Sequence, residues 1–533
     1  MTVPVPMWPQ PLDPLHSFAL SAGVAALPLL LILILMGGLR KSGLFASGCG
    51  LALTVLLAIA VWRMPPMMVV SSTAFGALFA LWPILWIVFG GLWLFNLTQD
   101  TGKFDLLRRW MEEHASGDPC IQVILVAFCF GALLEGCAGF GAPVALTSCL
   151  LVGLGFEARK AILVSLIANT APVAFGALGI PIVALAGATG LDLTKLSAMV
   201  GRQIPFLSFV LPAYLVWVMA RGKGLKRVWP AVLAAGGTFA LAQFLVSNLW
   251  GPYAADVIAA SLSVAAVVGL LRVWKPRGEL ATEVSSVGKL SSQQSFAAWL
   301  PWVILSVVMI LWSWLGLLTK GQVSIPIPTL HNQVLITLYQ KPYSALYGFQ
   351  PLAAGTAVFV SVLITAICFR IRPGVVATAG WKTVRQLAIP GLTVMTIVGL
   401  TYLYNYSGMA YTLGAAAARV GPAFPILSSY LGWLACFLSG SDSASNLLFG
   451  NLQVAAAHQL HLNPILTAAT NSSGAVAGKM ISPQNIAVGV TTVGLIGQEG
   501  RILRATFWHS VLFAGLIGLL AWAQAYWLTS MIP

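Results

Sequence analysis

The sequence predicts an all-α polytopic membrane protein. Of its 533 residues, 59% are hydrophobic and only 8% are charged, whereas soluble domains carry about 25% charged residues. Apolar runs of about 20 residues, the length that crosses a bilayer core, recur along the whole chain. The alternating segments of about ten residues that are typical of transmembrane β-barrels do not occur. We therefore expect about twelve transmembrane helices and, from two unusual stretches described below, two re-entrant hairpins.

The apolar runs give the expected spans in chain order. The first run has no basic segment before it and no clear cleavage site, so we expect a retained helix rather than a signal peptide. The remaining runs are separated by short loops that carry most of the charged residues. The predicted spans are 18–36, 44–62, 74–97, 161–190, 203–220, 229–248, 254–271, 298–317, 352–369, 387–406, 464–490 and 506–528.

Two further apolar stretches, 121–155 and 427–458, contain helix-breaking motifs. The first contains LEGCAGFGAPVA and the second contains LSGSDSASNL. Within a helix, glycine costs about 1 kcal/mol relative to alanine and proline about 3 kcal/mol, so both stretches are expected to turn. The second has about 11 residues on each side of its motif, roughly 17 Å of helix, which favours a re-entrant hairpin. The first is longer and is also compatible with two full spans.

Basic residues predict the orientation. The net charge is +14, which in a membrane protein reflects basic inner loops rather than a nucleic-acid partner. If the N-terminus lies outside, most of the 28 lysines and arginines fall on the inner side. This assignment requires each unusual stretch to return to the side from which it came. Both chain termini are then expected outside.

The unusual motifs form an internal repeat. Residues 169–181 (NTAPVAFGALGIP) align without a gap with residues 471–483 (NSSGAVAGKMISP), and each segment follows one of the unusual stretches. The first stretch opens to the inside and the second to the outside, which predicts an inverted-topology repeat, common in secondary transporters. Chance similarity among small residues is the alternative. The predicted division is 1–248 (first half), 249–297 (connecting span and loop) and 298–533 (second half).

The repeated motifs also suit an anion site. A helix that begins at a turn within the membrane points free N–H groups and the positive end of its dipole into the cavity. Nearby amides and hydroxyls would bind the carboxylate and hydroxyl of a small anion; the alternative is hydrogen bonding to their own helices. The candidate substrate-binding residues are Gly139, Gly141, Asn169, Thr170, Ser443, Ser445, Asn446, Asn471, Ser472, Ser473 and Lys479.

Glu135 and Asp442 are expected to be the only acidic residues at membrane depth. An ionisable residue there indicates function by default. Removal from water favours the neutral form of a carboxyl group, so either residue is a candidate carrier of a proton. The alternative is a structural anchor for an unwound turn. Lys479, the one basic residue deep in a span, would pair with Asp442, attract a substrate carboxylate or form a structural ion pair.

No motif indicates an enzyme, a metal site or a cofactor. The seven cysteines form no CxxC pair and no HExxH sequence occurs, so we expect free thiols, no metal and no cofactor. Ser443 with Lys479 is the one conceivable nucleophile and base pair. The sequence therefore favours a carrier over an enzyme, with a passive channel as a further alternative.

Several segments carry a family resemblance. FCFGALLEGCAGFGAPVA, NTAPVAFGALGIPI, GWLACFLSGSDSASN and GKMISPQ resemble the L-lactate permease family, and the similarity runs nearly end to end. The resemblance implies import of L-lactate, glycolate and other 2-hydroxymonocarboxylates with protons, by alternating access across the bacterial inner membrane. The family is grouped with a superfamily whose dicarboxylate members often couple to sodium and bind substrate between two hairpin tips. A sodium-coupled carboxylate transporter is therefore the alternative.

Overall fold

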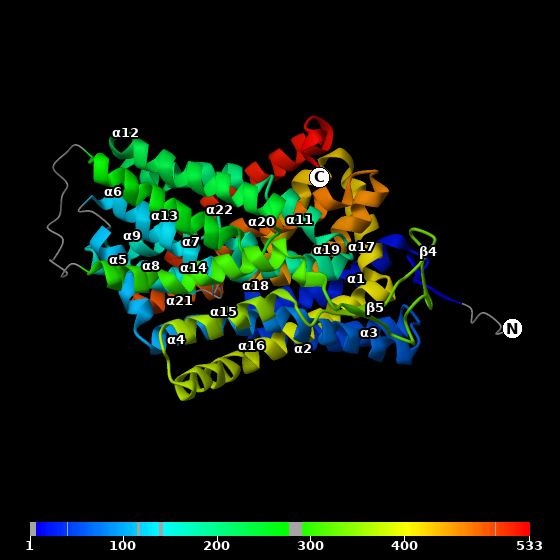
Figure 1. Cartoon of the computed structure of the whole chain (residues 1–533). Helices are drawn as coiled ribbons and strands as arrows, with labels where there is room; N and C mark the ends of the chain where they lie inside the picture. Colours follow the sequence, from blue (N-terminus) through cyan, green and yellow to red (C-terminus); the bar gives the residue numbers. More distant parts are fainter. Residues whose placement is uncertain (1–6, 40, 115–117, 138–141, 277–289, 496) are drawn as a thin grey trace.

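The computed structural model describes residues 7–39, 41–114, 118–137, 142–276, 290–495 and 497–533. Helices dominate, and most of them run roughly along one common direction (Figure 1). The strands β4 and β5 lie at one end of this bundle, while α5 and α6 lie at the other. The predicted all-α architecture is confirmed.

The helices of the first part follow the apolar runs, with several breaks. Three short π-helical segments, η1 to η3, and the 3₁₀ turn η4 interrupt or extend them. The elements are α1 (Phe18–Leu33), η1 (Ile34–Gly38), α2 (Gly43–Ala60), α3 (Pro66–Phe79), η2 (Ala80–Leu85), α4 (Trp86–Asp100), α5 (Lys103–His114), α6 (Pro119–Gln122), η3 (Val123–Phe130), α7 (Gly131–Cys137), α8 (Ala142–Gly153), α9 (Ala158–Ala168), η4 (Val173–Phe175), α10 (Gly176–Thr189), α11 (Leu193–Val200), α12 (Ile204–Leu249) and α13 (Ala255–Val273).

The second part contains nine helices and three 3₁₀ turns within the described residues. They are α14 (Ser292–Trp314), η5 (Leu317–Thr319), α15 (Ala354–Cys368), α16 (Pro373–Ser407), α17 (Met409–Ala417), η6 (Ala418–Ala423), α18 (Phe424–Ser439), α19 (Asp442–Gln459), α20 (Pro464–Lys479), α21 (Pro483–Thr492), α22 (Glu499–Tyr526) and η7 (Thr529–Met531).

Ten of the described helical segments are long and apolar enough to cross a membrane, or up to eleven if a bent pair counts as one span. Their outer surfaces carry many exposed apolar side chains, such as Leu56, Phe206 and Ile389. A large apolar surface of this kind matches a lipid environment rather than water. The chain is therefore a multi-pass membrane protein.

The helices differ from the predicted spans in two places. Spans 203–220 and 229–248 both lie within α12, whose backbone is non-helical at Arg221 and Val228, between these two spans. Span 161–190 is broken, and its two parts are bent by 64°. Span 464–490 is divided into α20 and α21. Two of the predicted spans are thus broken, and the exact number of spans stays a prediction.

Both breaks come just before the prolines that align in the repeat. In the first half, Ala177, Leu178 and Gly179 have positive φ angles, followed by Pro181. In the second half, α20 ends at Lys479 and α21 begins at Pro483. Proline lacks an N–H group and fits the first turn of a new helix. The two motifs therefore end in similar backbone breaks, while the opposite orientation of the halves and their boundaries stay predictions.

Each unusual stretch consists of two helices that pack against each other. In the second, α18 and α19 are joined by Gly440, in the left-handed region (φ +69°), and Ser441, whose Oγ caps α19 by accepting from Ala444 N at 3.2 Å. In the first, α7 packs against α8. The 12 residues of α8 span about 18 Å, less than the roughly 30 Å of a bilayer core. The re-entrant course of both pairs stays a prediction.

Close helix packing surrounds the second pair. A Cβ atom at Gly432 of α18 would lie 1.9 Å from the carbonyl oxygen of Asn471 in α20, and one at Gly474 would lie 2.2 Å from the carbonyl oxygen of Ser429. Small residues allow helix backbones to approach in membranes. This packing brings α18, α19 and α20 together around their polar residues.

The loop 318–350 and the segment before α1 form two small sheets. In one sheet, β2 (Val323–Pro326) pairs antiparallel with β5 (Leu346–Phe349). In the other, β3 (Val334–Ile336) pairs antiparallel with β4 (Lys341–Pro342) and parallel with β1 (Trp8–Pro9). The segment before α1 is therefore attached to this loop.

Candidate functional site

An ion pair connects the two repeated motifs. Lys479, the last residue of α20, donates from Nζ to Oε1 of Glu135 in α7. Both side chains are buried. Gly176 leaves room for the carboxylate, since a Cβ atom there would lie 2.8 Å from Glu135 Oε1. Of the alternatives for Lys479, the structure thus shows an ion pair, with Glu135 as partner rather than Asp442.

Asp442 is the first residue of α19 and is also buried. Its Oδ2 accepts a hydrogen bond from Ser472 Oγ at 2.9 Å, while Oδ1 has no partner among the described residues. Ser472 belongs to α20, the helix that ends at Lys479. We refer to the buried side chains of Asp442, Lys479 and Glu135 as the charged cluster.

Amide side chains hold this cluster together. Asn446 Nδ2 donates to Ser472 Oγ and to the carbonyl oxygen of Pro181, both at 3.0 Å. Asn471 Nδ2 donates to Asn446 Oδ1 at 3.0 Å and to Ser445 Oγ at 3.4 Å. In this conformation these four predicted binding residues bond mainly to protein groups. They join α19 to α20 and to the break before α10.

The first half contributes polar atoms without partners. Asn169 and Thr170 lie in the break after α9, and both are buried. Asn169 Oδ1, Thr170 Oγ1 and, in α20, Ser473 Oγ have no hydrogen-bond partner among the described residues. A buried polar atom of this kind calls for an explanation, such as a ligand or an ion. Gly139 and Gly141, predicted to bind substrate, lie outside the described residues.

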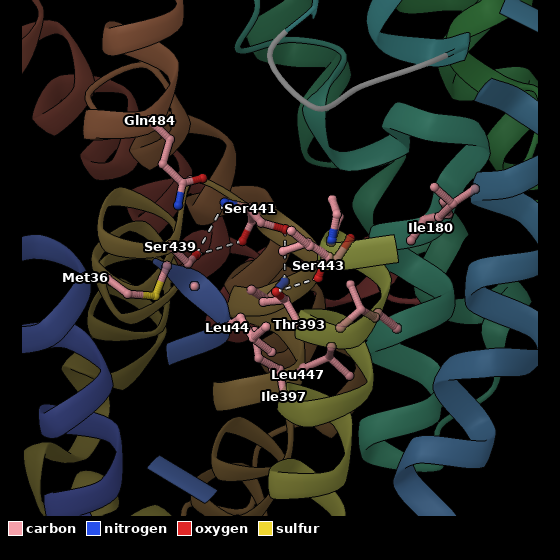
Figure 2. Close-up of a pocket in the computed structure, with 18 of the residues that line it drawn as sticks. Met36, Leu44, Ile180, Thr393, Ile397, Ser439, Ser441, Ser443, Leu447 and Gln484 are labelled. Carbon is pink, nitrogen blue, oxygen red and sulfur yellow. Dashed lines mark hydrogen bonds between the residues drawn. The ribbon is translucent and has the colours of Figure 1, made fainter. Parts of the chain in front are cut away.

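A cavity of about 370 Å³ begins at the turn between α18 and α19 (Figure 2). Ser439, Ser441 and Ser443 form a polar end together with Gln484 and Asn485 of α21. The other walls, from η1, α2, α4, α10, α16 and the following turns of α19, are mainly aliphatic. They include Met36, Leu44, Ile180, Ile397 and Leu447.

Two helices begin at the polar end of this cavity. Ser441 caps α19, and Ser482 caps α21 by accepting from Asn485 N at 3.3 Å. The first turns of both helices line the cavity, so their N–H groups and dipoles favour an anion there. Asn485 Nδ2 also donates to the carbonyl oxygen of Lys479 at 3.0 Å, which links the cavity wall to the ion pair.

The cavity lining only partly matches the predicted site residues. Within the described part of the chain, Ser443 is the one predicted residue that lines it. Sequence reasoning missed Ser439, Ser441, Gln484 and Asn485, although they lie in or directly after the two motifs of the second half. The available signal was a serine before the start of each helix, Ser441 before α19 and Ser482 before α21.

A third buried acid corrects the expectation that only Glu135 and Asp442 lie at depth. Asp256, in the first turn of α13, is 1% exposed, and its Oδ1 accepts from Gln243 Nε2 at 2.8 Å. A Cβ atom at Gly136 would lie 3.1 Å from Asp256 Cβ. The prediction failed because Asp256 is near a span end in sequence, while α13 packs against α7 in space.

No group of three or more potential ligand side chains, suited to a metal ion, is found among the residues that the structure describes. The charged cluster pairs one amine with carboxyl groups, and the cavity adds hydroxyls, amides and helix N-termini. Such an arrangement can bind a small anion and exchange protons.

The chain is similar to known proteins along nearly its whole length. The family profile described as L-lactate permease matches residues 21–528. The glycolate permease GlcA of Escherichia coli is 40% identical over 558 residues, covering 98% of this chain and 99% of its own. The L-lactate permease of Bacillus subtilis is 38% identical, covering 99% and 100%, and that of Escherichia coli is 37% identical with the same coverage.

Among solved structures, the chain is similar to the crystal structure of the YdaH transporter of Alcanivorax borkumensis. The TM-score is 0.46 at 14% identity, over 97% of this chain and 99% of that one. The family profile and the relatives agree with the motifs quoted above. The chain belongs to the L-lactate permease family.

Proposed function

We propose that this protein is a secondary transporter that carries small 2-hydroxymonocarboxylates, L-lactate and glycolate, together with protons. Family membership supports a permease rather than an enzyme. The relatives named above are permeases for L-lactate or glycolate, 37–40% identical over nearly the full chain. By the same argument, the protein lies in the bacterial inner membrane. We place both termini outside, because most lysines and arginines then fall on the inner side.

The observation that carries this proposal is the polar end of the cavity. The carboxylate binds at the joint N-termini of α19 and α21, where N–H groups and two dipoles point. The 2-hydroxyl bonds to the Ser443, Gln484 or Asn485 side chains, all of which line the cavity. The aliphatic walls accept the methyl group of lactate. Lactate and glycolate differ by one methyl group, which changes the binding free energy in a fitted pocket by about 1–3 kcal/mol. We therefore propose that the site accepts both.

Coupling to protons follows from the buried charges. Asp442 is the first residue of α19 and stands between Ser441 and Ser443, which line the cavity. A neutral Asp442 admits the anion, whereas an ionised one repels it, so proton and anion each increase the affinity for the other. Glu135, paired with Lys479, is the second candidate carrier. Breaking that pair would free Lys479 for the substrate carboxylate.

Alternating access is supported by a contrast between two regions. The cavity lies beside the connection of α1 and α2, through Met36, Ser42 and Gly43. Toward the strands β4 and β5, aromatic rings pack together. The ring centroids of Tyr343 and Tyr406 are 4.3 Å apart in a stacked arrangement, and those of Phe75 and Tyr402 are 4.9 Å apart in an edge-on arrangement. We infer an inward-open conformation in which this aromatic cluster closes the outer path.

A sodium-coupled carboxylate transporter is the alternative. The unpaired oxygens of Asn169 and Thr170 favour it, because hard cations prefer oxygen ligands. In that case the break after α9 would bind the ion, and the carboxyl cluster would be structural.

Uptake into proteoliposomes tests both candidates. Labelled L-lactate uptake is measured with a pH gradient and a sodium gradient imposed separately, and with D-lactate, glycolate, pyruvate and acetate as competitors. Uptake driven by the pH gradient without sodium supports the proposal, and competition by glycolate but not by acetate supports a 2-hydroxyl contact. Uptake that requires sodium and ignores a collapsed pH gradient selects the alternative.

A further inference from the structure

Asp256 has a single hydrogen-bond donor among the described residues. Gln243 Nε2 donates to Asp256 Oδ1 at 2.8 Å and to the carbonyl oxygen of Ala171 at 3.3 Å. Gln243 Oε1 is occupied by Ser208 Oγ at 2.8 Å. Asp256 Oδ2 is buried without a partner in the described structure. One amide thus links this carboxyl group to the break that contains Asn169 and Thr170.

Among the residues that the structure describes, Asp256 has no ion pair with a basic side chain. On α7, Glu135 and Cys137 are the titratable groups close enough to interact with it. On α12, Asp256 contacts Gln243. The helices α10 and α14 also pack against α13 but carry no titratable side chain. Cys129 of η3 contacts Ser263, two turns along α13, and Tyr253 precedes the helix. Lys479 lies beyond Glu135 and is bound to it.

Charge therefore distinguishes Asp256 from Glu135. The Glu135 carboxylate has a buried ammonium partner, which compensates its charge. Among the described residues no ion pair involves Asp256, and burying an uncompensated carboxylate costs far more than burying a neutral acid. The neutral form of Asp256 is the one that this packing accommodates. Gly136 lets α13 approach α7 closely, since a Cβ atom there would lie 3.1 Å from Asp256 Cβ, and Glu135 is the preceding residue of α7.

We propose that Asp256 holds a proton in this conformation and exchanges it with Glu135 during transport. The inference rests on the proposed proton coupling. The O–H bond of the Asp256 carboxyl breaks, the Glu135 carboxylate gains the proton, and Asp256 becomes the anion. The charge of the pair does not change. Glu135, now neutral, releases Lys479, whose ammonium group is then available to the substrate carboxylate.

A purely structural role is the competing explanation, in which Asp256 only anchors α13 to α12 through Gln243. Two variants separate these roles. Asp256→Asn keeps an acceptor oxygen for Gln243 but cannot release a proton. Gln243→Met removes the hydrogen bond and leaves the carboxyl group. Asp105→Asn, which changes an exposed carboxylate in the first turn of α5, is the control.

The test uses the full-length protein in proteoliposomes with two measurements of L-lactate movement. One is accumulation driven by a pH gradient; the other is exchange of labelled for unlabelled lactate at equal pH, which needs no net proton transfer. Asp256→Asn is expected to lose accumulation by about tenfold or more while keeping exchange. Gln243→Met and Asp105→Asn are expected to keep both.

Any of three results overturns the inference but leaves the proposed function intact. The first is normal accumulation in Asp256→Asn, and the second is an equal loss of accumulation and exchange in that variant as a folded protein. The third is a loss of accumulation with exchange kept in Gln243→Met. If Asp256→Asn does not fold, Asp256→Glu replaces it; a displaced pH profile of accumulation supports the proposal and an unchanged profile overturns it. Wild-type protein without pH-driven uptake overturns the proposed function, and this inference with it.

Discussion

Lys479 is the residue through which the two repeated motifs meet, and its partner sets the charge of the cluster. Sequence reasoning placed Lys479 and Glu135 at depth because each is a lone charge in an apolar run. It did not pair them, because they are 344 positions apart and belong to different halves. Asp256 was missed for a related reason: its position near a span end looks solvated, and only the packing of α13 on α7 buries it. Lone charges were thus predictable, whereas their partners were not.

Glu135→Gln is expected to abolish uptake driven by a pH gradient, because glutamine cannot carry the proton. The variant also leaves Lys479 buried without a counter-ion, which destabilises a folded protein by about 3–5 kcal/mol. Thermal unfolding in detergent should therefore show a lower midpoint, and the double variant Glu135→Gln/Lys479→Met should recover most of it. Normal proton-coupled uptake in Glu135→Gln would show that Glu135 is not the carrier.

Ser443→Cys is expected to react with a hydrophilic thiol reagent, and L-lactate should slow the reaction. The reason is that Ser443 lines the cavity at the proposed carboxylate site. Ser445→Cys, two positions along the same helix, is the matched control because Ser445 is fully buried and its Oγ donates to the carbonyl oxygen of Gly432 at 3.0 Å. The exposed Cys149 and Cys368 are first replaced by serine. Equal labelling of both variants would contradict this placement of the cavity.

At the scale of helices, breaks were more predictable than contacts. Glycine, proline and serine in the two motifs indicated where helices end, and α18 ends at the expected motif, with Gly440 in the left-handed region. The same rules placed a continuous span at 464–490, where the chain breaks before Pro483 instead. The close approach of α18 to α20 was not predictable, because the glycines at the contact are spaced like ordinary packing residues. Only the structure shows that a Cβ atom at these glycines would collide with the backbone of the neighbouring helix.

Gly432→Ala is expected to destabilise the protein and to reduce transport, since its Cβ atom would lie 1.9 Å from the carbonyl oxygen of Asn471. Helices α18 and α20 would have to separate, and overpacking of this kind costs about 1–3 kcal/mol or more. Gly23→Ala is the control, as a Cβ atom there meets nothing within 4 Å. Unfolding temperatures and lactate uptake are measured for both. A neutral Gly432→Ala variant would argue against this helix contact.

At the scale of the whole molecule, the family and the class of protein were predictable, and the arrangement of the halves was not. Composition and apolar length identified a membrane protein, and the motifs identified the family. The cavity, by contrast, combines α2, α4, α10, α16, α19 and α21, elements far apart in the chain. On the far side, α10 is tied to α16: Tyr402 donates to the Gly187 carbonyl oxygen at 3.2 Å and Asn405 to that of Ala188 at 2.9 Å. This contact must open if access alternates.

A cysteine pair replacing Ala188 and Asn405 tests that requirement. In a background without the native cysteines, crosslinking the pair with an oxidant or a short thiol-specific linker is expected to stop lactate uptake. Cleavage by a reductant should restore uptake where the link is a disulfide. The two single variants, treated in the same way, are the controls. Unchanged uptake in the crosslinked protein would show that α10 and α16 do not separate during transport.

The buried ammonium group of Lys479 and the buried carboxyl groups of Glu135, Asp442 and Asp256 have an electrical consequence. Because the single positive charge is already matched by Glu135, every further anion in this region needs a proton beside it. On the proposed cycle, the loaded and the empty protein then carry the same charge across the bilayer. Transport should not respond to the membrane potential, and the attainable accumulation should follow the pH difference alone, about tenfold for each pH unit.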